Sequence, residues 1–153
     1  MNQPAPQLTT TPFTFTQLLS STRRGARLAR LLGVSQLRSW GPSQDLTERA
    51  EVVIAELAAN AVLHGRLAGR SFRLTLVYDA PAGRLRIDVT DARGDRWPVL
   101  RPANALPEGA LDADGRGLAL VTAIADHWET LPYPPSGKTV RAELTGPGWK
   151  HPT

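Results

Sequence analysis

The sequence contains no cysteine, so neither disulfide bonds nor thiolate metal sites can hold the fold together. It also lacks long hydrophobic segments, and runs such as Val52–Ala55 are far too short to cross a bilayer. The segment Met1–Gln7 has neither the basic start nor the apolar centre of a signal peptide. These absences predict a soluble, cytoplasmic protein that does not engage a membrane.

Aromatic residues are few, at 6% of the chain, and they are not interleaved with basic residues. The net charge is nevertheless +4, and arginines concentrate it in the first quarter of the chain, at Arg23, Arg24, Arg27, Arg30 and Arg38. Such a patch suits either nucleic acid or an acidic protein surface. Because no DNA-binding motif accompanies it, we favour a solvated helix face or a protein contact, without direct nucleic-acid binding.

The composition is that of an ordinary globular protein, with 41% hydrophobic and 21% charged residues. A length of 153 residues suits one compact domain. Residues 1–16 are rich in proline, threonine and glutamine, which predicts a flexible lead-in. The domain itself is expected over residues 17–146, followed by a C-terminal tail over residues 147–153.

Two helices are predicted in the first half of the domain. The first covers residues 22–33 or slightly more and precedes a Trp-Gly-Pro turn. The second begins with Asp45 as its N-cap, because Glu48 follows three residues later in a capping-box pattern. It is expected to end near His64, where Gly65 provides a common stop signal.

The second half contains segments that alternate as strands do. Residues 72–78 and 84–90 predict one antiparallel hairpin, and residues 128–131 and 139–144 predict another. A helix that is apolar on most sides, and therefore buried, is expected over residues 117–126. The order of elements predicts an α+β fold, an α/β sandwich in which helices cover one face of a mostly antiparallel sheet.

Two proline-rich segments separate these elements. Residues 95–114 show no periodicity, and such long loops in small domains are often functional lids. Residues 132–139 come within one residue of a phosphate-binding Walker A pattern. Their prolines remove backbone donors that a phosphate cradle uses, and a strand-like pattern follows, so we interpret them as a hairpin turn.

Glu56, Asn60 and His64 are spaced four apart in the second helix and therefore stack along one side of it. Glu56 and Asn60 lie at the edge of the apolar stripe, and His64 falls on its line. Burying a carboxylate or an amide without partners costs about 1–3 kcal/mol. The spacing indicates either a functional site or an amphipathic helix with polar residues at its margin, and this segment alone does not decide between them.

Two other segments carry possible chemistry. Asp91 ends a predicted strand and precedes a turn at Gly94, where a carboxylate can accept a hydrogen bond from an exocyclic amine such as that of adenine. Gly115, Arg116 and Gly117 precede the last helix, where free N–H groups and the helix dipole can hold a phosphate. Taken singly, the first pattern is also a common turn, and the second is also a common hinge.

Together, the three segments resemble the GHKL superfamily of ATP-binding domains. Residues 56–65 are similar to its N box, and Gly115–Leu118 to its second glycine box. Asp91 fits the first glycine box, in which Arg93 stands where glycine is usual. The resemblance covers residues 17–145 and implies a Bergerat-type ATP-binding fold with a lid loop. Within the superfamily, the chain looks most like actinobacterial anti-sigma-factor serine/threonine kinases.

The resemblance also implies roles for single residues. Glu56 would be the general base, and Asn60 would bind Mg²⁺ through its side-chain oxygen. Asp91 would read the adenine amino group. The remaining residues implied to bind the nucleotide are Gly94, Gly115, Arg116, Gly117, Leu118 and Thr139. For His64 we favour a structural hydrogen bond.

The implied function is that of an Mg-ATP-binding regulatory protein. It would bind a protein partner such as a sigma factor and phosphorylate a serine or threonine of an antagonist protein. An alternative is a switch that binds ATP to shape partner binding without any chemistry. A third hypothesis is an ATP hydrolase or a detached catalytic module of a histidine kinase. The resemblance leaves open whether the protein forms a homodimer.

Overall fold

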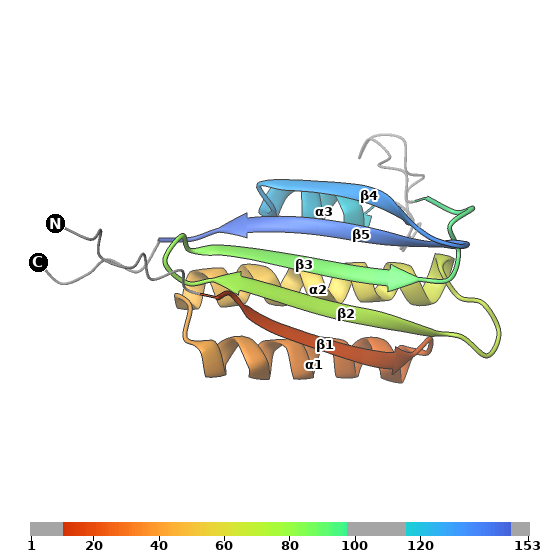
Figure 1. The fold of residues 1–153 in the computed structure, drawn as a ribbon, viewed down its shortest axis with the longest axis horizontal. Coiled ribbons are helices and arrows are strands. Elements are labelled where there is room, and N and C mark those ends of the chain that lie inside the picture. The colour runs from red at the N-terminus through yellow and green to blue at the C-terminus, as the bar shows by residue number, and fades with distance from the viewer. Residues whose placement is uncertain (1–10, 98–115, 148–153) are drawn as a thin grey trace, which may run out of the picture.

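The fold is built on one antiparallel sheet of five strands, in the order β1-β2-β3-β5-β4 (Figure 1). The computed structural model describes residues 11–97 and 116–147. In chain order, the elements are β1 Phe13–Ser20, α1 Arg23–Trp40, α2 Gln44–His64, β2 Ser71–Asp79, β3 Arg84–Asp91, α3 Arg116–Ile124, β4 His127–Tyr133 and β5 Gly137–Thr145.

The three helices cover the same face of the sheet (Figure 1). On β3, the alternate residues Leu85, Ile87 and Val89 point toward these helices and are buried. They join one core cluster with apolar residues of α2 such as Ile54 and Leu57. The predicted α+β sandwich is therefore confirmed. We call the opposite face, against which none of the described helices packs, the open face.

A strand at one edge of the sheet was not predicted from the sequence. β1 pairs antiparallel with β2 along its whole length. The predicted flexible lead-in over residues 1–16 is therefore wrong for residues 13–16, and residues 1–10 lie outside the described part of the chain. The strand has one buried side chain, Leu19, because an edge strand is held by backbone pairing and needs little apolar surface.

Both N-terminal helices are present, but some of their ends differ from prediction. α1 runs on to Trp40 before the predicted turn. α2 starts one residue before Asp45, so Asp45 lies inside its first turn and cannot be the N-cap. Ser43 caps the helix instead, and its hydroxyl oxygen accepts a hydrogen bond from the Leu46 N–H at 3.1 Å. The predicted end of α2 at His64 is confirmed.

Both predicted hairpins, β2–β3 and β4–β5, are confirmed, and the Walker-like segment lies at the turn of the second one. The helix predicted over residues 117–126 corresponds to α3, but it is not buried on most sides. Leu118 and Val121 are buried, whereas Leu120 is 44% exposed. Among the helices in residues 11–97 and 116–147, none is long and apolar enough to span a membrane.

Candidate functional site

The candidate site forms where β3 ends beside α2, at the arrowhead of β3 in Figure 1. Asp91, the last residue of β3, lies opposite Lys138 of β5. The Lys138 Nζ atom is 2.9 Å from the Asp91 carboxylate and also donates to the Arg93 carbonyl at 2.9 Å. Both charged side chains are 4% exposed. Because a buried charge without a partner is costly, each residue of this pair depends on the other.

The residue after α2 packs directly on the Asp91 carboxylate. This residue is Gly65, which is buried, and a Cβ atom added to it would collide with that carboxylate. Its φ is −98°, a value open to any residue, so space and not backbone conformation requires glycine here. The sequence presented Gly65 mainly as a helix stop, and nothing local in the sequence reveals the contact with Asp91.

We expect Gly65→Ala to destabilise the protein by about 1–3 kcal/mol, the usual cost of overpacking. The added methyl group must displace either the Asp91 carboxylate or the end of α2. Urea unfolding of wild type and variant measures the loss. Arg66→Ala, a change at the exposed neighbouring residue, is the control and should leave the midpoint nearly unchanged. A midpoint for Gly65→Ala equal to that of wild type would contradict the close approach.

Asn60 and His64 of α2 reach the same place as Asp91. The three residues line a cavity of about 20 Å³ between α2 and the sheet. Its other walls are Leu57, Ala61, Val89, Arg96, Lys138 and Val140. This volume suits about one water molecule, so a larger ligand enters only if a wall moves. Among these wall residues, Arg96 is exposed to solvent, whereas the others are buried or half-buried.

Glu56 lies one helical turn before Asn60 and is half-buried. It is not one of the residues that line the cavity. Burial raises the pKa of the Glu56 carboxyl above its ordinary value, because the charged form loses solvation. A carboxylate with a raised pKa is a stronger base, which suits it to accept a proton.

The turn after β3 contains Arg93, which stands where the first glycine box usually has glycine. Its guanidinium makes two hydrogen bonds to Asp95, at 2.9 and 2.8 Å, and this pairing lowers the pKa of Asp95 to about 2. Arg93 is not among the walls of the cavity, so its side chain leaves that space clear. Its backbone N–H donates to Asp91 Oδ1 at 2.8 Å and helps to orient the carboxylate.

Gly94 packs against the β4–β5 turn. Its N–H donates to the Ser136 carbonyl at 2.7 Å. A Cβ atom added to Gly94 would lie 2.6 Å from the same carbonyl oxygen, which is too close for any other residue. The structure thus shows Gly94 in contact with the β4–β5 turn. Its contribution to nucleotide binding stays a prediction.

Thr139 was implied to contribute to nucleotide binding, and the structure places its side chain away from the Asp91 carboxylate. It is opposite Thr90, and the two hydroxyl oxygens are 2.7 Å apart. Successive side chains of a strand point to opposite faces, so Thr139 and Thr90 point to the open face of the sheet. The neighbouring Lys138 points toward Asp91 instead. Sequence reasoning missed Lys138 because it depends on the register between two strands far apart in the chain.

The second glycine box is described only in part. Gly115 and most of the predicted lid, residues 98–114, lie outside the described residues. α3 begins at Arg116 and includes Gly117, so the predicted start of this helix is correct to within one residue. Leu118 is 2% exposed, so its side chain packs into the protein interior.

The chain belongs to the family of histidine kinase-like ATPase domains, which matches residues 19–144. This range contains the last two residues of β1, nearly all of the other four strands, all three helices and the cavity at Asp91. The suspected superfamily is thereby confirmed, and membership of an ATPase domain family implies that the chain binds ATP.

Solved structures share the fold. One is the structure of the RsbU and RsbW domains of Rv1364c from Mycobacterium tuberculosis, with a TM-score of 0.64 and 18% identity, covering 87% of this chain and 32% of that chain. Another is the SiaB–SiaC complex from Pseudomonas aeruginosa, with a TM-score of 0.61 and 11% identity, covering 85% of this chain and 88% of that chain.

At these identities the likeness shows the fold alone. The chain also spans only about a third of the length of the Rv1364c chain that it matches. No curated protein matches the sequence.

Proposed function

We propose that this chain is an Mg-ATP-binding regulatory protein that transfers a phosphoryl group from ATP to a serine or threonine hydroxyl of a partner protein. One observation carries the proposal: Asn60 of α2 and Asp91 of β3 meet at one cavity in a chain of the histidine kinase-like ATPase family. The likeness in fold to an RsbW domain and to SiaB, which was solved in complex with SiaC, supports a regulatory role exercised through protein partners.

Asp91 is suited to hold the adenine amino group. A carboxylate can accept about four hydrogen bonds, and Asp91 already accepts from the Lys138 ammonium and the Arg93 N–H. The remaining acceptor capacity fits one N–H of an exocyclic amine. Entry of the base requires more room than the cavity of about 20 Å³ provides. Displacement of the exposed Arg96 side chain is the simplest way to open it.

Asn60 is suited to hold Mg²⁺. Its half-buried amide borders the cavity and has no side-chain hydrogen bond to another residue in the described part of the chain, so its oxygen is available. Mg²⁺ prefers oxygen ligands and commonly takes only one or two from protein, with phosphates and water completing its shell. When bound, the ion neutralises charge on the phosphates. One amide oxygen therefore fits the donor set that the metal needs.

Glu56 is suited to be the general base. It projects from α2 one turn before Asn60, and its raised pKa makes it a better proton acceptor than an exposed glutamate. In this role it accepts the proton of the attacking hydroxyl. The rest of the rate enhancement comes from positioning and from electrostatic stabilisation of the phosphoryl group.

A surface on α1 is suited to a protein partner. Arg24, Arg27, Leu28 and Leu31 are exposed along one side of this helix, and they combine positive charge with apolar area. Such a surface complements an acidic protein surface that carries apolar side chains. It supports the proposed class of partners, a sigma factor or a phosphorylated antagonist.

Glu56→Ala tests the proposed chemistry. The variant should bind ATP as wild type does but lose nearly all transfer of label from γ-labelled ATP to protein in extract of the native cell. Calorimetry measures binding, and autoradiography of separated proteins measures transfer. Undiminished labelling by Glu56→Ala would remove Glu56 from the base role. Tight ATP binding by wild type without labelling of any protein would favour the non-enzymatic switch over the kinase.

A further inference from the structure

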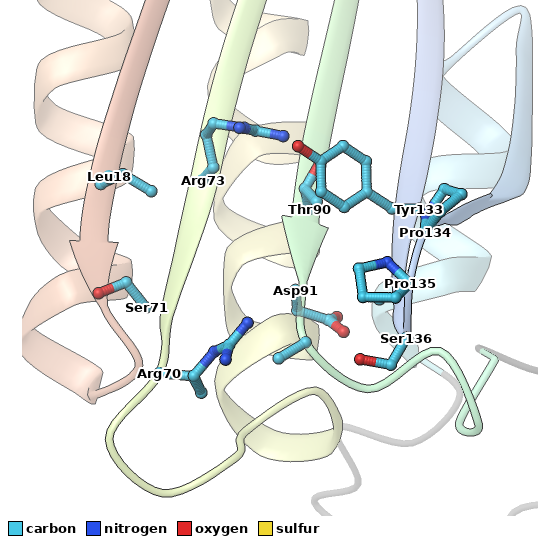
Figure 2. A pocket seen from close by; sticks show the side chains of 12 residues that line it. Leu18, Arg70, Ser71, Arg73, Thr90, Asp91, Tyr133, Pro134, Pro135 and Ser136 are labelled. Carbon is cyan, nitrogen blue, oxygen red and sulfur yellow. The ribbon is translucent and has the colours of Figure 1, made fainter.

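A second and larger pocket lies on the open face of the sheet, across from the candidate nucleotide site. It has a volume of about 290 Å³ and is bordered by strands and by the β4–β5 turn (Figure 2). Leu18 of β1, Arg73 of β2 and Thr90 of β3 are directly opposite one another in register and form its floor. Tyr133 and the residues after it form a wall.

The pocket carries positive charge. Arg73 and Arg70 both line it, and in residues 11–97 and 116–147 no carboxylate forms an ion pair with either guanidinium. Asp91 also borders the pocket, but its carboxylate is paired with Lys138 toward the helix layer.

Asp88, the next acidic residue on the open face of β3, is also paired with arginines. Asp88 makes two hydrogen bonds to Arg141, at 2.9 and 3.1 Å, and lies 3.4 Å from Arg86. Among the side chains that the structure describes, none therefore compensates the positive charge of Arg70 and Arg73.

The side chains of Arg73 and Tyr133 reach toward one another across β3 (Figure 2). The guanidinium carbon of Arg73 lies 4.8 Å from the centre of the Tyr133 ring. A stacked guanidinium is held in place by the ring while its N–H edge stays available for an oxyanion. Tyr133 itself is 43% exposed, and Pro134 and Pro135 extend the apolar wall that it begins.

We propose that this pocket binds a small molecule that joins one oxyanion, a carboxylate or a phosphate, to a flat apolar body. Arg73 binds the oxyanion, because guanidinium groups match both anions in charge and geometry, and Arg70 at the other end of the pocket adds positive charge (Figure 2). The body packs against the apolar wall that Tyr133, Pro134 and Pro135 form. The volume of about 290 Å³ is at the lower end of the range for small-molecule sites, which favours a ligand of about one ring.

This site is distinct from the nucleotide site. Asp91 contributes to both, but its carboxylate faces α2, and the sheet separates the two cavities. The ligand and ATP should therefore bind at the same time. Binding to the open face needs none of the residues proposed for phosphoryl transfer.

Calorimetric titration with phenyl phosphate and with benzoate tests the proposal. Wild type should bind at least one of these probes, and Arg73→Gln should weaken that binding roughly tenfold or more, as expected for loss of a charged hydrogen-bond partner. Tyr133→Ala should weaken it about threefold. Arg84→Gln is the matched control, because Arg84 is an exposed arginine at the far end of β3, and it should bind as wild type does.

Several outcomes would overturn the proposal. Failure of both probes to bind wild type is one, and equal binding of phenol, which lacks the oxyanion, is another. If Arg84→Gln and Arg73→Gln lost the same affinity for the probe, the loss would show only a general effect of charge. Displacement of the bound probe by Mg-ATP would place it in the nucleotide site instead. Binding that survives saturating Mg-ATP and depends on Arg73 supports the proposal.

Discussion

Asp91→Asn is expected to lower the free energy of unfolding by about 3–5 kcal/mol, the usual cost of removing one partner of a buried ion pair. The substitution leaves Lys138 charged and 4% exposed, with the Arg93 carbonyl and an uncharged amide oxygen in place of a carboxylate as acceptors for its ammonium group. Urea unfolding followed by circular dichroism measures the change. ATP affinity should fall as well, because the amide no longer presents two acceptor oxygens to the adenine amino group.

Two further variants separate this effect from a general loss of charge. Asp95→Asn breaks a well-formed ion pair with Arg93, but that pair is on the surface, so its loss should hardly move the unfolding midpoint. Adding Lys138→Met to Asp91→Asn removes the unpaired charge and should recover much of the lost stability. If Asp91→Asn lowered the unfolding midpoint no more than Asp95→Asn does, the buried pair would not hold the end of β3 to β5.

Asn60→Ala is expected to abolish Mg²⁺-dependent ATP binding, with a loss of affinity of about 100-fold or more. The side chain that we propose as the protein ligand to the metal disappears, and the charge on the phosphates is then poorly neutralised. Calorimetry with Mg-ATP, and with ATP in the presence of a chelator, measures the loss. For wild type, chelation should weaken binding strongly, whereas for Asn60→Ala it should make little difference.

Leu63→Ala is a suitable control for Asn60→Ala, because Leu63 is on the same helix and is 51% exposed. It should keep the affinity of wild type for Mg-ATP. Both variants should unfold at nearly the same urea concentration, since Asn60 makes no side-chain hydrogen bond with another described residue. Unchanged Mg-ATP affinity in Asn60→Ala would refute the assignment of Asn60 as the metal ligand.

Elements with a strong hydrophobic period could be predicted from the sequence, whereas those held by backbone pairing or by context could not. α2 and the β2–β3 hairpin follow directly from their spacing of apolar residues. β1 was missed because it buries only Leu19, so its stability comes from pairing with β2. The capping residue was misassigned because Asp45 and Ser43 are both good caps, and only the start of the helix decides between them.

Only the residues of the candidate site that belong to short sequence motifs could be predicted. Asn60 and Asp91 belong to short motifs, and the structure brings them to one cavity. Lys138 depends on its register opposite Asp91, which nothing within either strand encodes. Because successive residues of β5 face opposite sides of the sheet, Lys138 meets Asp91 while its neighbour Thr139 meets Thr90. The role of Gly65 depends on a packing contact between α2 and β3.

A crystal structure of the protein with Mg²⁺ and a non-hydrolysable ATP analogue tests the central claim most directly. We predict the adenine amino group within hydrogen-bond distance of the Asp91 carboxylate and the metal bound to the Asn60 side-chain oxygen. The cavity beside α2 would then be enlarged, with Arg96 displaced from its wall. A nucleotide bound on the open face, or bound without contact to Asp91 and Asn60, would contradict the account.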